Sequence, residues 1–261
     1  MSDKIKGALF AAALLVAACG SPKDGWELVW SEDFSDPVID LDNWSRIPWG
    51  SPDWQNMMAP GREDLAFVED GQLVLLGKNN DGTTADTTEF VTGGIWSAGK
   101  KSFRLARFEI RAKFNSVKGF WPAIWLLPDD GVAYPHGGEI DIMEHLNSET
   151  IAYQTVHSYY SLNVCDSIPK HNSTAVIDPS EWNVYAVEIH KDSVCFFTNE
   201  EKTLTYPKVE GLDEQFPYSD HPFYLILSNQ LGGAWVGEVA PEQLPSELRI
   251  DWVKVYQLKE D

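Results

Sequence analysis

Polar and apolar residues alternate along much of the chain with a period of two, which is typical of half-buried β-strands. In segment 102–114, charged Arg107 falls on one face and apolar Phe108 on the other. Segment 65–78 contains two such runs around an Asp-Gly pair, which favours a β-hairpin. No helical period of 3.6 extends beyond about two turns. The pattern therefore predicts an all-β chain.

Further strands are predicted toward the C-terminus. Segment 182–207 contains three runs, with turns near Lys191-Asp192 and Asn199-Glu200, and two more runs cover 222–231 and 248–258. Many short strands joined by Gly, Pro and Asn turns predict a sandwich of antiparallel sheets. Since no repeat, low-complexity segment or linker follows residue 25, we expect a single domain over residues 26–261.

The first 25 residues have a different character. Lys4 and Lys6 precede an apolar run that ends at Cys19. The run is too short to anchor a chain across a bilayer and fits a signal peptide, residues 1–18. The sequence LVAAC resembles a bacterial lipobox, which implies cleavage before Cys19 and acylation of that residue. An ordinary secretion signal is the alternative. Residues 19–25 would form a tether, and the domain would be lipid-anchored at the bacterial cell envelope.

The amino-acid composition limits the classes of molecule that the protein is expected to bind. A formal charge of −20 would repel a phosphate backbone, which argues against nucleic acid. The 11 Trp and 9 Tyr suit either a Trp-rich core or the flat faces of sugars. Cys165 and Cys195 could pair in an oxidising compartment or remain separate thiols. A monomer is expected.

Three acids occur within the six residues of EIDIME, Glu139 to Glu144. In a strand, Glu139 and Asp141 share one face and the isoleucines take the other. Glu144 lies five positions after Glu139, which is an odd number. A regular strand would therefore turn its carboxylate toward the core, at a high cost in free energy. A β-bulge near Met143 would return it to the face of the other acids. The alternative is that the strand ends after Met143.

With one residue absorbed, Glu139 and Glu144 lie about four strand steps apart, roughly 13 Å between Cα atoms at ~3.3 Å per step. Their side chains could then bring the two carboxylates to about 5–6 Å. That separation is close to the ~5–5.5 Å of glycosidases that retain anomeric configuration, where one carboxylate attacks and the other protonates the leaving oxygen. Mutual repulsion raises one pKa, which suits a general acid.

The EIDIME segment matches the ExDxxE signature of glycoside hydrolase family 16. GGIWSAGKKSFRLARFEIRAKF, GFWPAIWLLP, YQTVHSYY and LRIDWVKVY also resemble family segments, in family order, so the resemblance spans about residues 28–256. It implies a β-jelly-roll sandwich with a concave substrate cleft. It also implies that Glu139 is the nucleophile, Asp141 its helper and Glu144 the acid/base.

A metal site is the competing role for these acids, because His136, His145 and His157 are available. However, no His-x-x-x-His or Glu-x-x-His helical spacing is present, and no cofactor is expected for catalysis. The resemblance also implies a structural calcium ion on the far face, with ligands from Asp251, the Gly71 carbonyl and Glu32.

Substrate contacts are expected from residues in the matched segments. Trp121 is implied as a sugar platform, while Trp125 could equally belong to the core. His157 resembles a cleft histidine near the acid/base. Arg111 either contacts substrate or lies on a solvated ion-pair face. The remaining candidates are Gln230 and Trp235 in SNQLGGAWVG, and Trp54, which could form a wall with Trp49.

The expected function is that of a retaining, endo-acting β-glycosidase that cleaves β-1,3 or β-1,4 bonds. The substrate is a β-glucan or a galactose-containing glycan, including mucin-type O-glycans, because SRIPWGSPDWQNMMAPGRED departs from the pattern of family glucanases. Two alternatives remain open: a non-catalytic glycan-binding lipoprotein and a transglycosylase on the same fold.

Overall fold

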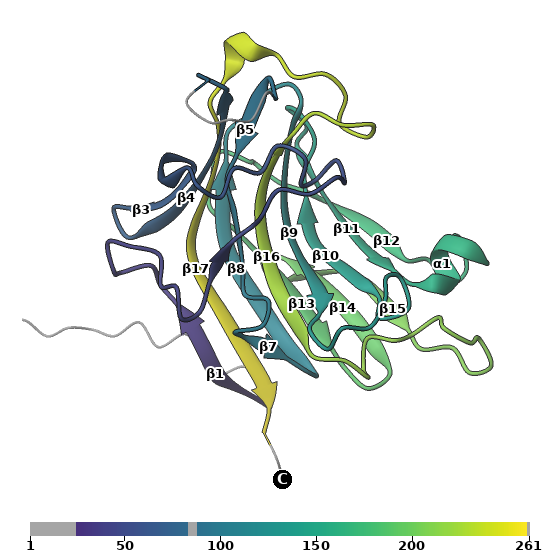
Figure 1. Cartoon of the computed structure of the whole chain (residues 1–261). Coiled ribbons are helices and arrows are strands. Elements are labelled where there is room, and N and C mark those ends of the chain that lie inside the picture. The colour runs from purple at the N-terminus through teal and green to yellow at the C-terminus, as the bar shows by residue number, and fades with distance from the viewer. Residues whose placement is uncertain (1–24, 83–87, 260–261) are drawn as a thin grey trace, which may run out of the picture.

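The computed structural model describes residues 25–82 and 88–259. They form two antiparallel sheets packed face to face, as the sequence predicts (Figure 1). The predicted signal peptide, Cys19 and nearly all of the tether lie outside these residues. Within them, no helix has the length and apolar character needed to span a bilayer.

One sheet contains the C-terminal strand β17, which pairs with β8, β1 and β4. Its strands follow the order β15-β14-β13-β8-β17-β4-β3, with β1 paired to β17 and β5 to β4. The nine strands are β1 (Trp26–Glu32), β3 (Ala66–Glu69), β4 (Gln72–Asn79), β5 (Phe90–Thr92), β8 (Ala106–Phe114), β13 (Asn183–Ile189), β14 (Ser193–Thr198), β15 (Glu201–Pro207) and β17 (Ser246–Leu258).

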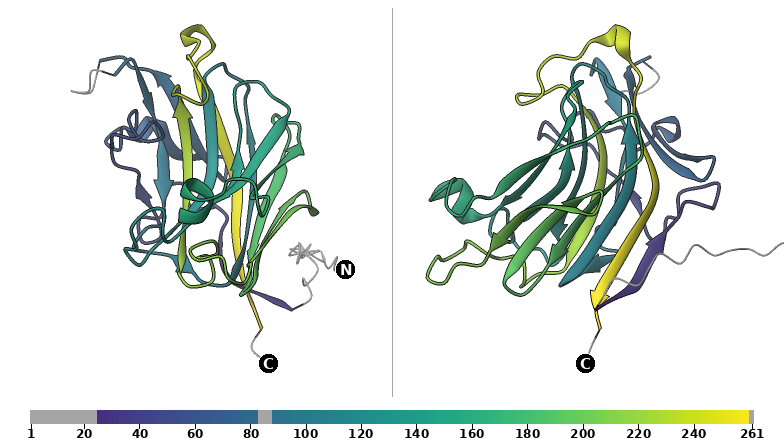
Figure 2. Two further views of the ribbon diagram at one scale, coloured as in Figure 1. Left: turned by 90° about the vertical axis from the view of Figure 1, so that its right-hand side faces the viewer. Right: turned by 180° about the vertical axis from the view of Figure 1, so that it is seen from behind.

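The second sheet carries the EIDIME segment at its centre. Its order is β12-β11-β10-β9-β16-β6-β2, with β7 paired to β16. The eight strands are β2 (Ser45–Arg46), β6 (Gly94–Trp96), β7 (Ser102–Phe103), β9 (Phe120–Pro128), β10 (Glu139–Glu144), β11 (Ile151–His157), β12 (Asn172–Val176) and β16 (Phe223–Leu231). Both sheets are strongly curved, as Figure 2 shows from two further sides.

The helical elements are short, in agreement with the absence of a helical period. They are α1 (Tyr159–Asn163) and the 3-10 turns η1 (Glu63–Leu65) and η2 (Pro241–Gln243). The core lies between the sheets and consists of buried residues from strands of both, including Phe108, Ile140 and Val253. Cys195 is buried and Cys165 is partly exposed, and both are free thiols, so they do not pair.

The predicted run 102–114 is divided between the sheets. Residues 102–103 form β7 beside β16, whereas β8 begins only at Ala106 in the other sheet. The chain changes sheet at Leu105, whose φ of +50° interrupts the extended backbone. The predicted alternation holds within β8, because Phe108 and Ile110 are buried in the core while Arg111 on the opposite face is partly exposed.

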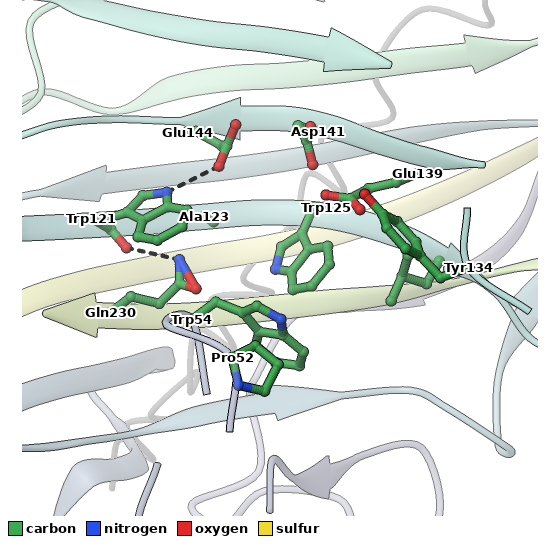
Figure 3. Close-up of a pocket in the computed structure, with 11 residues that line it drawn as sticks. Pro52, Trp54, Trp121, Ala123, Trp125, Tyr134, Glu139, Asp141, Glu144 and Gln230 are labelled. Atoms are coloured by element: carbon green, nitrogen blue, oxygen red, sulfur yellow. Dashed lines mark hydrogen bonds between the residues drawn. The ribbon is translucent and has the colours of Figure 1, made fainter. Parts of the chain in front are cut away.

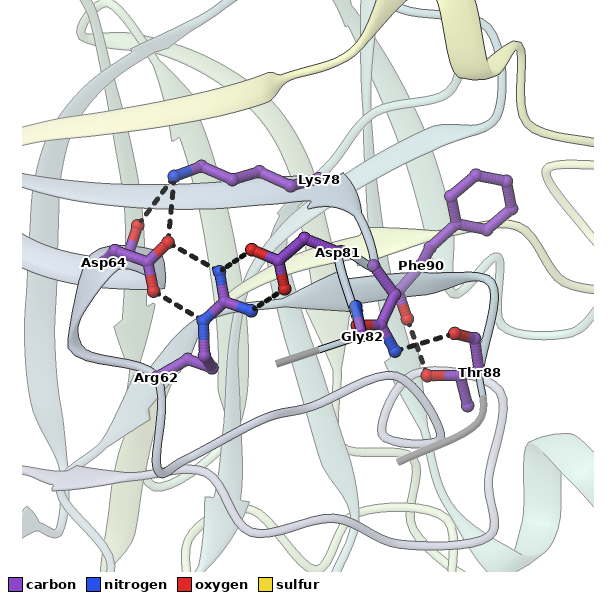
Figure 4. Close-up of polar contacts among 8 residues, drawn as sticks. Arg62, Asp64, Lys78, Asp81, Gly82, Thr88 and Phe90 are labelled. Carbon is purple, nitrogen blue, oxygen red and sulfur yellow. Dashed lines mark hydrogen bonds and ion pairs between the residues drawn. The ribbon is translucent and has the colours of Figure 1, made fainter. Parts of the chain in front are cut away.

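A cluster of ion pairs fixes the segment around Arg62, which follows Trp54 in the chain. Arg62 pairs with Asp64 at 2.7 Å and with Asp81 at 2.9 Å, and Lys78 pairs with Asp64 at 3.2 Å (Figure 4). Arg62 is mostly buried, whereas both aspartates are about half exposed. The cluster therefore ties this segment to β4 through partly solvated pairs, each of which contributes little alone.

Candidate active site

The predicted bulge is present in β10. On the β11 side, Glu139 pairs with His157 and Glu144 with Tyr153, so five steps on β10 match four on β11. Against β9, the register shifts between Asp141 and Met143. One extra residue is thus absorbed in the Ile142–Met143 region, close to the position that the cost of burying Glu144 predicts.

The bulge places the three acids on one wall. Ile140, Ile142 and Met143 are fully buried in the core between the sheets. Glu139, Asp141 and Glu144 all line the same pocket on the outer face of the eight-stranded sheet (Figure 3). The pairing also confirms the predicted four strand steps between the two glutamates.

Each acid has a polar neighbour that fixes its position. The Trp121 indole donates to Glu144 Oε1 at 3.0 Å. Asp141 hydrogen bonds Glu139, and its Oδ2 lies 3.3 Å from His157 Nε2. Contacts of this kind orient the carboxyl groups.

Burial sets the protonation of all three groups. It raises the pKa of Glu139 to about 8 and that of Asp141 to about 7, and the charge of Asp141 adds to the effect on Glu139. Burial, followed by the charge of Asp141, holds the pKa of Glu144 well above its ordinary value. Three carboxyls in one pocket therefore do not all ionise near neutral pH, and at least one proton remains available for transfer.

Glu139→Gln should stabilise the protein increasingly as pH rises. The ordinary pKa of 4.5 rises to about 8 in the folded state, so the folded state binds more protons between these values. Wild-type stability consequently falls as pH rises from 4.5 to 8, whereas glutamine does not titrate. We expect Tm to be higher by about 3 °C at pH 8, corresponding to ~1 kcal/mol, and equal near pH 4.5.

Thermal melts from pH 4.5 to 8.5 would measure this difference. Glu242→Gln, at an exposed position in η2, provides the control for loss of one surface charge. A gap between wild type and Glu139→Gln that does not change with pH would contradict the burial argument.

The acids lie where two differently lined hollows meet. One, with a volume of about 490 Å³, has largely apolar walls, formed by Trp54, Trp125, Leu127 and Tyr134 among others. The other, of about 590 Å³, is lined mainly by polar side chains of β11 and β12 and their flanks, including Thr155, His157, His171, Asn172 and Thr174. A chain-like ligand could thus extend on both sides of the acids.

Most of the predicted substrate contacts lie in these hollows. Trp121 and Gln230 line the apolar one together with Trp54 and Trp125, whose rings meet edge to face at 4.8 Å. Gln230 Nε2 donates to the Trp121 carbonyl at 3.2 Å. His157 and Trp235 line the polar hollow, where Trp235 packs on the rings of Trp121 and Tyr153. Trp49 is 60% exposed and does not line either of the two hollows.

Arg111 is not a cleft residue, which corrects one sequence-based prediction. It lies on β8 in the nine-stranded sheet, pairs with Asp251 and stacks over Trp182 at 4.7 Å. Strand alternation identifies the residues that share a face with Arg111 but not the sheet to which that face belongs. The alternative reading, an ion-pair face, is the one observed.

The expected calcium ligands lie around one part of β17, and both of their carboxylates have protein partners. The carboxylate of Asp251 already pairs with the Arg111 guanidinium. Both oxygens of Glu32 accept hydrogen bonds, from the Phe34 amide at 3.0 Å and the Trp44 indole at 3.2 Å. Gly71 lies in the β3–β4 turn, near Asp251 across the β4–β17 pairing. Both side chains of this set therefore have protein partners, and the calcium ion stays a prediction.

The histidines proposed for a metal site are also dispersed. His136 pairs with Glu214 outside the cluster, and His145 is buried with Nδ1 2.9 Å from the Ile151 carbonyl. Only His157 joins the acids, within 4.8 Å of atoms of Glu139 and Asp141. Asp141 already interacts with both His157 and Glu139, so the arrangement of the cluster is explained without a metal ion.

Trp121→Phe should move the alkaline limb of a pH–activity profile upward. The indole hydrogen bond lowers the pKa of Glu144, so its loss makes that carboxyl harder to ionise. We expect about a tenfold fall in kcat, in line with one hydrogen bond to a charged group. Trp125→Phe is the matched control, because its indole donates to Ser228 at 3.2 Å and not to an acid. An equal shift in both variants would exclude this role of Trp121.

Comparison with known proteins agrees with the site. The chain matches the model of glycosyl hydrolases family 16 over residues 62–254. The chain belongs to this family. It is 35% identical over 239 residues, 89% of its length, to a keratan-sulfate endo-1,4-beta-galactosidase of Sphingobacterium multivorum, of which it spans 56%. It is 32% identical over 249 residues to a beta-glucanase of Rhodothermus marinus, covering 89% of this chain and 85% of that one.

A protein of known structure has a similar fold. Its structure comes from work on endo-acting O-glycanases that initiate mucin breakdown, expressed by prominent members of the human gut microbiota. The TM-score is 0.80 at 29% identity, covering 89% of this chain and 100% of that chain. Glycoside hydrolases of family 16 need no cofactor for catalysis, in line with the sequence-based expectation.

Some lining residues of this family 16 site were not found from the sequence. Tyr134 lies in the loop between β9 and β10, where no periodicity indicates which way a side chain points. His171 precedes β12 and enters the polar hollow because the Val156 amide donates to its carbonyl at 2.9 Å. The only signal for either residue was its polar, aromatic character beside a matched segment.

Proposed function

We propose that the protein is a retaining, endo-acting β-glycosidase. One observation carries the proposal: the bulge in β10 brings Glu139 and Glu144 to the same wall of an open cleft, with Asp141 between them. Two carboxyls close enough to flank one glycosidic bond are the arrangement that double displacement requires. The hollows on both sides of the pair suit cleavage within a chain rather than at its end.

In this proposal, Glu139 attacks the anomeric carbon while Glu144 donates its proton to the departing oxygen. Water then attacks the anomeric carbon while Glu144 takes a proton from it, and the bond from that carbon to Glu139 breaks. Asp141 orients Glu139 through their hydrogen bond. The indole of Trp121 orients Glu144 and forms part of the sugar-binding wall.

The substrate is proposed to be a β-glucan or a galactose-containing glycan joined by β-1,3 or β-1,4 bonds. Relatives of both kinds support this range. A panel of laminarin, mixed-linkage glucan, agar, keratan-type glycan and mucin glycans would test it, with product lengths and the anomer formed first read by NMR. We expect oligosaccharides of intermediate length and retained configuration on at least one substrate. Absence of new reducing ends from every glycan would refute the proposal.

We further propose that the chain is a lipid-anchored, monomeric envelope protein. The basic residues, short apolar run and Cys19 at the N-terminus support the anchor. The native chain expressed in a bacterial host should partition into detergent, and Cys19→Ser should not. Equal partitioning of the two would overturn the anchor, and light scattering of the domain would test the monomer.

A further inference from the structure

Tyr134 is an aromatic residue in the ten-residue loop between β9 and β10, five positions before Glu139. More than half of its surface is exposed, at 59%. Its hydroxyl nevertheless points into the apolar hollow beside the carboxyl of Glu139 (Figure 3). An exposed ring whose polar end reaches a buried acid suggests a function for that polar end.

The loop is fixed around this residue. The His136 amide donates to the Ala133 carbonyl at 2.9 Å, and the Gly138 amide donates to the Pro135 carbonyl at 3.0 Å. The His136 ring stacks on Tyr159 of α1, with centroids 4.9 Å apart, and Nδ1 pairs with Glu214. Tyr134 is therefore held by contacts on its C-terminal side rather than by burial of its own ring.

Gly138 joins this loop to the catalytic strand. Its φ is +79°, and a Cβ there would lie 2.6 Å from the ring of Tyr218. Only glycine meets both conditions without strain. The turn that aims Tyr134 at Glu139 is thus directly coupled to the start of β10.

The hydroxyl of Tyr134 lies beside the Glu139 carboxyl, in the position of a hydrogen-bond donor (Figure 3). Among the groups around Glu139, burial and Asp141 disfavour its charged form, whereas His157 and the Tyr134 hydroxyl favour it. A nucleophile must be ionised when the sugar arrives, so the groups that favour the charge matter for the rate. His157 reaches Glu139 only through space, while Tyr134 contacts it.

We propose that Tyr134 is a positioning residue, which donates its phenolic hydrogen to Glu139 and so holds that carboxylate ready for attack. The inference rests on the proposed function of Glu139. In the first step, a Glu139 oxygen bonds to the anomeric carbon, the glycosidic bond breaks, and the leaving oxygen takes the proton of Glu144. Tyr134 keeps its own proton throughout, because loss of water around the hydroxyl in the hollow and then the Glu139 charge hold its pKa above the ordinary value.

Other ionisable groups surround Glu139 and contribute to its titration. They come from β10, β11, β16 and the segment before β16, and they are Asp141, Glu144, His157, Tyr224 and Tyr218. Among the tyrosines that the structure describes, Tyr134 is the one that lines the apolar hollow with its hydroxyl beside Glu139 (Figure 3). Tyr224 interacts with the charge of Glu139 but does not line that hollow, which makes Tyr224→Phe a matched control.

Tyr134→Phe keeps the ring and removes the donor. On the best substrate of the glycan panel, we expect kcat to fall about 10- to 100-fold, as for one hydrogen bond to a charged group, with KM changed less than about threefold. The acidic limb of the kcat profile should move to higher pH, because Glu139 becomes harder to ionise. A loss in KM alone, or a limb that does not move, would overturn the proposal.

A second measurement is independent of turnover. In protein labelled with ¹³C at the glutamate carboxyls, NMR titration should show a higher pKa for Glu139 in Tyr134→Phe than in wild type, and no such rise in Tyr224→Phe. An unchanged Glu139 titration would refute the positioning role even if the enzyme were inactive on every glycan. Inactivity of wild type with the expected titration shift would refute the proposed function alone.

Discussion

Glu139→Gln is expected to lower kcat by on the order of 10⁴-fold while the fold remains intact, because the amide cannot form the covalent intermediate. The side chains are nearly isosteric, and Glu139 is already disfavoured as an ion by burial, so the variant should fold at least as well as wild type. Turnover of the best panel substrate and a far-UV spectrum would be measured together. Residual activity above about 10% would remove Glu139 from the nucleophile's role.

Chemical rescue distinguishes a nucleophile from a residue that merely supports one. In Glu139→Ala, azide can occupy the vacated space and attack an activated aryl glycoside directly. The product should then be the glycosyl azide of inverted, α configuration. Rescue with retained configuration would assign the attack to a different carboxyl and would require Glu139 and Glu144 to exchange roles.

Glu144→Ala is expected to have an effect that depends on the leaving group. Natural substrates need a proton at the departing oxygen, so their hydrolysis should fall by about 10²- to 10⁴-fold. Aryl glycosides with acidic phenols leave without that proton, and their first step should be nearly unaffected. A burst of phenol followed by slow turnover should appear, because water no longer has a base to activate it.

Azide again provides the control for this variant. It needs no base, so it should restore turnover of Glu144→Ala and give the β-glycosyl azide, which keeps the configuration. An equal loss on natural and activated substrates would contradict general acid catalysis by Glu144. It would point instead to a role in holding Trp121, whose indole donates to this carboxyl.

The strands and the acid cluster were predictable because two simple rules apply to them. Alternation orients side chains within a strand, and the cost of burying a carboxylate predicts the bulge that brings Glu144 to the cleft. The same rules could not place Arg111, since alternation does not say which of two sheets a strand joins. The contacts of Asp251 and Glu32 were equally inaccessible, because their partners are set by the packing of distant strands.

Site residues in loops were harder to predict from the sequence than those in strands. Tyr134 reaches Glu139 through two turns, a glycine in the left-handed region and a histidine held by α1, and no periodic pattern encodes such a path. Trp54 was found only through its residue type, although the loop that carries it is long and irregular. Aromatic residues near a matched motif are therefore worth testing even where no strand is predicted.

The bulge in β10 also determines which changes in chain length this strand can survive. Losing either Ile142 or Met143 would leave the second glutamate four positions after Glu139, an even offset that an unbulged strand already directs outward. Losing Ile140 would instead put Asp141 beside Glu139 in the chain and turn it toward the core. Proteins that evolve from this sequence should therefore keep their function after losing one residue just after Asp141. They should lose it after a deletion just before Asp141, so the two halves of one strand differ in the deletions that evolution permits.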